Sequence, residues 1–193
     1  MTPEVASHNT TRSTGNAAAE TVRPLLKWAG GKRQLLPHIR QLYPETFHRY
    51  LEPFLGSGAV FFDLYSDGHL DGRPAVLMDT NADLIGCYQA VRDHTERVIR
   101  NLSRLAAAYE KNPREHYYAV RDNRFNPQRQ RIFNGSGPDS SRYTPSLAAM
   151  LIYLNRTGFN GLFRLNSQGL FNVPLAVWIL EGFMRGVPKE IDE

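Results

Sequence analysis

Two glycines and an aspartate have the types and spacing of a nucleotide-binding site. Gly56 and Gly58 follow a short apolar run, and Asp79 closes the next apolar run, 21 positions after Gly58. Glycines let the backbone approach a ligand, and an acidic residue about 20 positions further on accepts hydrogen bonds from ribose hydroxyls. The same glycines could instead form only a tight strand-to-helix connection. A dinucleotide is disfavoured, because Phe61 stands where that fingerprint has its third glycine.

The segment Lys27–Lys32, which reads KWAGGK, is a second candidate for chemistry. Its Gly-Gly-Lys resembles part of a phosphate loop, but Leu26 and Arg33 stand where that loop requires glycine and serine or threonine. One interpretation is a turn before a helix, with a solvated lysine. The other is a grip of backbone and Lys32 on a carboxylate, with Trp28 stacked on a flat ring.

Arginines, asparagines and aromatic side chains stand among glycines over 154–174. Arginine can bridge guanine edges, asparagine can bridge adenine edges, and a large side chain can wedge between bases. The segment could also be a polar surface loop, because asparagine tolerates turns. Basic residues outnumber acidic ones over 111–142, where we expect contacts with DNA phosphates rather than a merely solvated face.

These segments lie among elements that predict an α/β fold. Apolar runs predict strands over 50–54 and 75–78, the second one buried and parallel, with a helix from Ala59 between them. Helical spacing over 84–105 predicts a long helix, capped by Asn81 and broken near His94.

The later part of the chain predicts a further apolar helix over 147–154, preceded by Ser146. Asp63 and Asp83 are expected to be solvated or to cap helices. Cys87 lies in the helical pattern of its segment and is expected to be buried and structural.

Composition limits the class of protein. With 193 residues, 41% of them hydrophobic, the chain is long enough for one sizeable domain. A net charge of +4 permits a nucleic-acid partner without establishing one. A single cysteine excludes a disulfide framework, and the scattered histidines lead us to expect no metal site. No apolar run would span a membrane, so we expect a cytoplasmic protein, associated with the nucleoid if bacterial.

Four segments in this order resemble the Dam-type (class D12) adenine-N6-specific DNA methyltransferase family. They read PLLKWAGGK from Pro24, YLEPFLGSGAVFF from Tyr50, LMDTNADLI from Leu77, and YLNRTGFNGLFRLN from Tyr153 with FNVP after it. The resemblance implies methyl transfer from S-adenosylmethionine to N6 of adenine in double-stranded DNA. It also implies a Rossmann-like methyltransferase fold, here incomplete, with the first part of the sheet and a helical DNA-recognition region.

The resemblance divides the chain and assigns its site residues. A flexible tail is expected over 1–21, a cofactor-binding part over 22–105, a target-recognition region over 106–175 and a divergent tail over 176–193. The residues implied at the cofactor are Trp28, Lys32, Glu52, Pro53, Phe54, Gly56, Ser57, Gly58 and Asp79, with Asp79 on the ribose. Those implied at DNA are Lys27, Phe159, Asn160, Leu162 and Arg164.

One part of the family pattern is missing. The family's catalytic tetrapeptide, usually D-P-P-Y, supplies the groups that accept the hydrogens of the adenine amine, and this chain has no two adjacent prolines. No catalytic residue is therefore assigned, and we expect the chain alone to be inactive. Because the resemblance ends after Leu175, we expect a shifted reading frame or a shortened gene.

The fold is expected to suffer as well, since the strand ending at Phe54 would become an edge and leave apolar surface open. The chain would then be unstable, or would depend on a partner. Two alternatives are a non-catalytic module that binds DNA or cofactor, and one half of a split methyltransferase completed by a second chain. A nicotinamide-dependent dehydrogenase is a more distant alternative.

Overall fold

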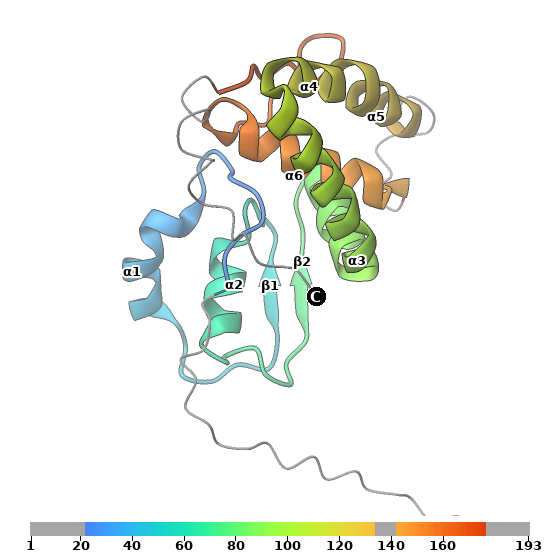
Figure 1. Cartoon of the computed structure of the whole chain (residues 1–193). Helices are drawn as coiled ribbons and strands as arrows, with labels where there is room; N and C mark the ends of the chain where they lie inside the picture. Colours follow the sequence, from blue (N-terminus) through green and yellow to red (C-terminus); the bar gives the residue numbers. More distant parts are fainter. Residues whose placement is uncertain (1–21, 134–141, 177–193) are drawn as a thin grey trace, which may run out of the picture.

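The computed structural model describes residues 22–133 and 142–176. The tails expected over 1–21 and 176–193 lie outside the described residues, except for Ala176. Figure 1 shows a small sheet with α1 and α2 at one end of the molecule and the helices α3 to α6 at the other. In chain order the elements are a 3-10 turn Lys32–Leu35, α1 Leu36–Ile39, a 3-10 turn Arg40–Leu42, β1 Tyr50–Glu52, α2 Ala59–Ser66, β2 Ala75–Leu77, α3 Ala82–Lys111, α4 Pro113–Val120, a π-helical turn Arg121–Phe125, α5 Asn126–Phe133, α6 Pro145–Thr157 and a 3-10 turn Phe159–Gly161.

The two strands pair in parallel, as their apolar runs predict. The prediction that the second strand is buried is wrong, because Val76 of β2 is 45% exposed. Val76 is the register partner of Leu51, which is 50% exposed, so both side chains lie on one open face of the sheet. The other face packs against α2, where the ring centroids of Tyr50 and Phe61 lie 6.5 Å apart. Within the described residues β1 pairs with β2 alone.

Local signals in the sequence determine where the long helix begins and where it bends. The side chain of Asn81 accepts a hydrogen bond from the backbone of Leu84 at 3.0 Å, which confirms the predicted cap of α3. The predicted break is also confirmed, because His94 has φ −141° and ψ 38° inside the helix. The expected start of the later helix is wrong by two residues. Helix α6 begins at Pro145, and the Thr144 hydroxyl caps it by accepting from Leu147 at 3.1 Å.

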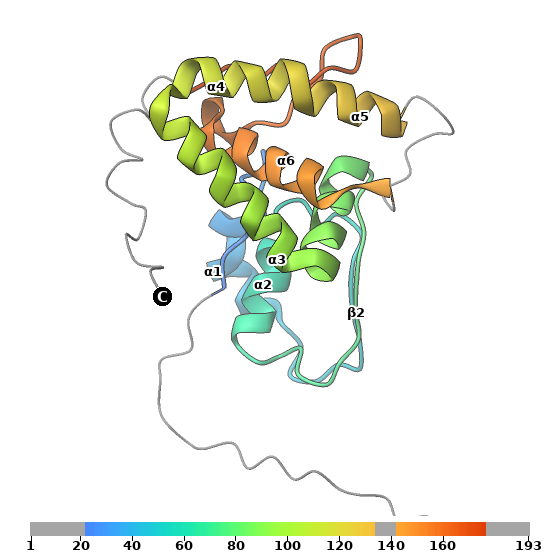
Figure 2. The same ribbon diagram turned by 45° about the vertical axis from the view of Figure 1, so that its right-hand side comes forward.

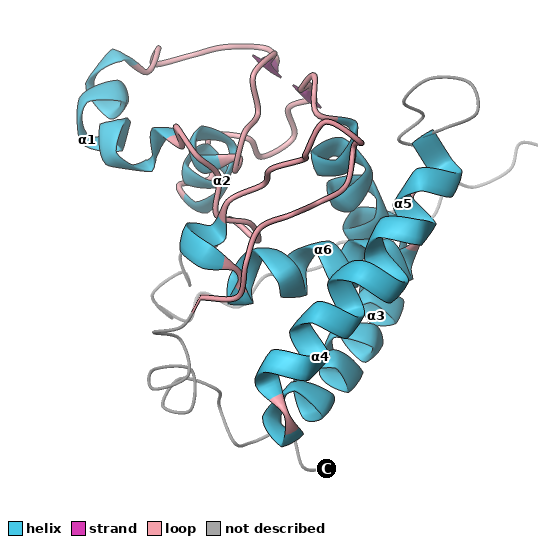
Figure 3. Cartoon of the chain, turned by 90° about the horizontal axis from the view of Figure 1, so that it is seen from above, coloured by secondary structure: helices cyan, strands magenta, loops and turns pink. Residues whose placement is uncertain are grey.

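The main core lies between the helices. Helix α6 is buried along nearly its whole length, which explains its apolar sequence, and α3 packs along it. Figures 2 and 3 show α4 and α5 running end to end beside α6. Cys87 is fully buried in this core, as expected, and burial raises the pKa of its thiol to about 12. A second, smaller cluster of Val60, Leu64 and Leu70 forms around α2. The segments that hold the candidate site residues lie where the main core meets the smaller cluster around α2.

Candidate functional site

The glycine turn after β1 lies directly against the end of β2. Gly56 and Gly58 have φ of 54° and 73°, values that favour glycine. The backbone N–H of Gly56 donates to one carboxylate oxygen of Asp79 at 2.9 Å, and the other oxygen accepts from the backbone of Asn81 at 2.9 Å. The 21-residue spacing therefore corresponds to a direct contact, with Asp79 half-buried beside the turn.

A tyrosine supports the turn from the helical side. The hydroxyl of Tyr88, on α3, donates to the backbone oxygen of Ser57 at 2.7 Å. Burial raises the pKa of Tyr88, so this hydroxyl keeps its proton at neutral pH. Ser57 and Gly58 are themselves buried, whereas Pro53 and Phe54 are exposed. The turn thus has a fixed inner side and an open outer side.

Lys32 is paired rather than free. Its ammonium donates to the carboxylate of Glu52 and to the backbone oxygen of Phe54, each at 2.7 Å. Glu52 is 4% exposed and also accepts from the Tyr50 hydroxyl at 2.8 Å. The lysine is therefore not merely solvated, because it binds a carboxylate of the chain itself. A grip on the carboxylate of a ligand stays a prediction. The turn before a helix is also present, with Gly30 at φ 71°.

Asn155, near the end of α6, joins the segment 154–174 to the segment Lys27–Lys32. Its side-chain oxygen accepts from the backbone N–H of Lys27 at 2.8 Å, and its amide donates to the oxygens of Lys27 and Gly161 at 2.9 and 2.7 Å. Gly161 has φ 62°, and a Cβ there would lie 2.5 Å from that of Lys27, so only glycine fits. The rings of Trp28 and Phe163 stack with centroids 5.5 Å apart.

The residues implied at DNA differ in exposure. Phe159 is 42% exposed, and Asn160, with φ 53°, is exposed beside it. The exposed Arg164 donates to the side chain of Asn172 at 2.8 Å. Leu162 is half-buried and packs against the main core, so it is less available to a partner than the others. The side chain of Lys27 is exposed where it passes Gly161.

One ion pair in this region does not follow the expectations. Asp83 was expected to be solvated or capping, but it is 2% exposed and accepts two hydrogen bonds of 2.8 to 2.9 Å from Arg129 of α5. Burial raises the pKa of Asp83, and the hydrogen bonds from Arg129 oppose that shift. Arg129 also donates to the backbone of Gly169 at 2.7 Å. Within the basic stretch 111–142, this arginine therefore serves the protein interior rather than DNA.

A cavity of about 270 Å³ lies between the residues that follow Asp79 and the segment 154–174. It begins immediately after Asp79 and extends to the ring that stacks on Trp28. Its lining residues are Thr80, Asn81, Ala82, Asp83, Arg129, Phe133, Phe163 and Leu165. Polar and aromatic residues thus line this cavity together, although the carboxylate of Asp83 is already bound to Arg129.

Sequence comparison identifies the family. The model of the D12 class of N6 adenine-specific DNA methyltransferases matches residues 28–177. This chain belongs to that family. It is 38% identical to the Type II methyltransferase M1.LlaDCHI of Lactococcus lactis subsp. cremoris over 79% of its own length and 47% of the relative. It is 37% identical to M.MjaIII of Methanocaldococcus jannaschii, covering 79% of the chain and 52% of the relative.

The DNA adenine methylase of Escherichia coli K12 is also 37% identical, over 79% of this chain and 47% of the methylase. This member of the D12 family therefore spans about half the length of the curated relatives it matches. Its described part is a mixed helical fold with a small parallel sheet. None of the described helices is both long and apolar enough to cross a membrane.

Sequence reasoning missed Asn155, Phe163 and the Asp83–Arg129 pair as residues that shape this region. Asn155 and Phe163 lie inside the third segment, but their partners are more than 100 residues away in the chain. A signal for Asp83 did exist. Asp83, Cys87 and Ala90 lie on one face of α3, and the last two are apolar, so the face itself places Asp83 in the interior.

Proposed function

We propose that this chain supplies the S-adenosylmethionine-binding and DNA-contacting parts of an adenine-N6 DNA methyltransferase. We further propose that β1 and β2 are the first strands of a Rossmann-like sheet. The observation that carries the proposal is the contact between the segment Lys27–Lys32 and the segment 154–174. Phe163, which lies between Leu162 and Arg164 in the chain, stacks on Trp28, and Asn155 binds Lys27 and Gly161 at once. Trp28, implied at the cofactor, therefore lies beside the segment implied at DNA.

The donor and acceptor groups fit S-adenosylmethionine. Lys32 uses two of its three N–H groups internally, which leaves one for the carboxylate of the ligand. Each oxygen of Asp79 accepts one backbone hydrogen bond and keeps a lone pair for a ribose hydroxyl. Gly30 faces open space, because a Cβ there would meet nothing within 4 Å.

The cofactor supplies an activated methyl group when bound. The residues of this chain would hold and orient it. Glu52, Pro53, Phe54 and the turn Gly56–Gly58 would surround its methionine part, and Trp28 would cover one side. Asp79 would fix the ribose, and the backbone bonds that it accepts from Gly56 and Asn81 would keep its carboxylate in place before the ligand arrives.

DNA would approach the surface formed by Phe159, Asn160 and Arg164, with Lys27 beside it. Asn160 and Arg164 carry the groups that can read base edges, and Phe159 is exposed enough to wedge into a base step. Leu162 would support this surface from its half-buried position. Such contacts would place the protein with DNA in the cytoplasm, and at the nucleoid in a bacterium.

The chain holds no pair of adjacent prolines and so no D-P-P-Y. We therefore propose that methyl transfer to adenine N6 requires groups beyond this sequence, and that this chain alone binds without transferring. A second polypeptide carrying the tetrapeptide is one way to supply them.

The proposal can be tested by measuring binding and transfer in parallel. Calorimetry should detect S-adenosylmethionine binding to the purified chain, and titration with double-stranded DNA should show affinity that falls as salt rises. Arg164→Ala should weaken DNA binding by about 1–3 kcal/mol and leave cofactor binding unchanged. Arg97→Ala, an exposed arginine of α3 outside both the segment 154–174 and the basic stretch 111–142, is the matched control for charge. Binding of neither ligand would contradict the proposal, and transfer of a labelled methyl group by the chain alone would contradict its second part.

A further inference from the structure

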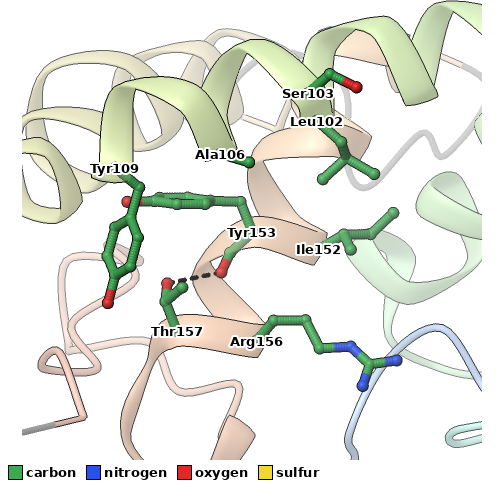
Figure 4. Close-up of a pocket in the computed structure, with 8 residues that line it drawn as sticks. All are labelled: Leu102, Ser103, Ala106, Tyr109, Ile152, Tyr153, Arg156 and Thr157. Atoms are coloured by element: carbon green, nitrogen blue, oxygen red, sulfur yellow. Dashed lines mark hydrogen bonds between the residues drawn. The ribbon is translucent and has the colours of Figure 1, made fainter. Parts of the chain in front are cut away.

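A second cavity, of about 440 Å³, lies away from the candidate site, between the later half of α3 and the end of α6. Figure 4 shows Leu102, Ser103 and Ala106 of α3 on one side and Ile152, Tyr153 and Thr157 of α6 on the other. Tyr109 and Arg156 complete the lining. The proposed methyltransferase chemistry does not use this cavity.

The cavity is apolar despite its polar residue names. The Thr157 hydroxyl is bound within α6, where it donates to the backbone oxygen of Tyr153 at 2.7 Å. The guanidinium of Arg156 points out of the cavity and donates to the backbone oxygens of Leu25 and Pro24 at 2.9 and 3.0 Å. Only the stem of Arg156 remains in the wall. The Ser103 hydroxyl is likewise bound within α3, where it donates to the backbone oxygen of Ile99 at 3.1 Å. Arg156 is the only charged residue of the lining, so the lining favours an apolar occupant.

The last described residues of the chain run to the edge of this cavity. Leu175 bridges with Gly158, and the backbone N–H of Ala176 donates to the oxygen of Thr157 at 3.0 Å. Ala176 is fully buried. The next four residues, 177–180, read VWIL and are all apolar. Two residues span at most about 7 Å, so the side chain at 178 is within reach of the cavity.

We propose that the segment Val177–Leu180 docks into this cavity, with Trp178 as its anchor. Burial of a tryptophan and its neighbours would remove apolar surface from water on both sides of the contact. The segment lies in the tail that sequence analysis set apart as divergent. Docking would give it a structural role in closing the α3–α6 interface.

Disulfide trapping tests the contact directly. In the full chain, Ser103→Cys combined with Ile179→Cys should form an intramolecular disulfide under mild oxidation. Arg104→Cys with Ile179→Cys is the matched control, because Arg104 is exposed on α3 but lies about 100° around the helix. The first pair should form the disulfide about tenfold faster than the control. Cys87 is buried and does not interfere.

Equal rates for the two pairs would overturn the proposal. So would a disulfide that forms mainly between two chains, because the occupant would then be a second copy.

Tryptophan fluorescence gives an independent readout, because the chain has only Trp28 and Trp178. The contribution of Trp178 is obtained by subtracting the spectrum of the Trp178→Phe variant. We expect blue-shifted emission that resists acrylamide. Ala106→Arg should place a charge in the cavity and shift this emission to the red, whereas Ala107→Arg, on the same helix but outside the lining, should not. Emission typical of a solvated Trp178 in the unmodified chain, or equal shifts in both variants, would overturn the proposal.

Discussion

Asp79 illustrates how one side chain can serve both the fold and a ligand. Its two oxygens accept the backbone N–H groups of Gly56 and Asn81, each at 2.9 Å, so the carboxylate ties the glycine turn to the start of α3. Because both bonds come from the backbone, the position of the carboxylate does not depend on flexible partners. The remaining lone pairs point to its proposed role on the ribose.

Asp79→Asn should therefore weaken S-adenosylmethionine binding by roughly 10- to 100-fold, because hydrogen bonds to a charged acceptor contribute about 1.5–3 kcal/mol. Isothermal titration calorimetry would measure the change. Asp71→Asn, an exposed carboxylate in the turn before β2, is the control and should bind as the unmodified chain does. Equal affinities for all three proteins would show that Asp79 does not contact the ligand.

Spacing in the sequence was informative for the glycine turn and Asp79, because a short, regular stretch of chain connects them. The distance from Gly58 to Asp79 is one helix and one strand, so spacing alone brings them to the same edge of the sheet. Spacing could not predict that Phe163 stacks on Trp28, because the intervening chain includes the six helices α1 to α6, whose packing decides the contact.

At the scale of elements, Arg129 fastens α5 to the first turn of α3. It binds Asp83 through two nitrogens, donates to Gly169 and lies 4.8 Å from the ring centre of Phe133. Both charged side chains are nearly buried, at 11% and 3% exposed. Loss of one partner would leave the other charge in the interior without compensation.

Arg129→Ala should lower the free energy of unfolding by about 3–5 kcal/mol, the usual cost of breaking a buried pair. Arg131→Ala, an exposed arginine on the same helix, should change it by less than about 0.5 kcal/mol. Urea denaturation would measure both. The double variant Arg129→Ala with Asp83→Ala should recover part of the loss, and a double variant no more stable than Arg129→Ala would contradict this account.

A second ion pair holds the short helices around α1 to α2. Arg40 and Tyr43 donate to Asp63, at 3.0 and 3.1 Å for one of its oxygens. The hydrogen bonds from Arg40 hold the pKa of Asp63 below its ordinary value of 3.8. A lowered pKa in the folded protein stabilises it at pH values above the ordinary pKa, and this contribution is lost as the pH falls through the lowered one.

Asp63→Asn should therefore lower the melting temperature by about 2–6 °C at pH 7. The difference from the unmodified chain should shrink as the pH falls below 3.8. Thermal melts between pH 7 and pH 2.5 would measure it, with the exposed Asp67→Asn as control. A difference that stays constant over this range would show that charge is not its cause.

Elements with local signals were predicted well, whereas the burial of β2 and of Asp83 was not. The cap at Asn81 and the break at His94 depend on nearby residues alone. The burial of β2 depends on what covers the sheet, and in the described residues one face is covered while Val76 lies on the other. An apolar strand sequence is the same in either case.

At the scale of the whole molecule, the open face of the sheet is an apolar patch on the surface of the described residues. Leu51 and Val76 are partners in the register, and Phe54 and Met78 follow them at 73% and 43% exposed. Apolar surface of this kind promotes association between molecules. The strands beneath it are also at the edges of a two-stranded sheet in the described residues, which adds unpaired backbone groups.

Replacing both Leu51 and Val76 with threonine should reduce aggregation and change the melting temperature by less than about 3 °C, because threonine keeps strand propensity and neither side chain is in a core. Light scattering during heating would measure aggregation, and circular dichroism would measure the melting temperature. Leu64→Thr, at a position only 3% exposed, is the contrasting variant and should lower the melting temperature strongly. Unchanged aggregation in the double variant would show that another surface is responsible.

The contact of Asn155 with Lys27 also has a consequence for the timing of folding. The two residues are 128 positions apart in the chain. During synthesis, Lys27 is therefore made long before Asn155, and the contact between them cannot form until Asn155 has been made. At typical rates of 5–20 residues per second, that wait lasts roughly 6–25 s. During this interval the strands can pair and α2 can pack, but Lys27 and Trp28 lack their contacts with Asn155 and Phe163. Ligand binding would then be acquired late and all at once, as residues 155–163 emerge and close the longest loop of the fold.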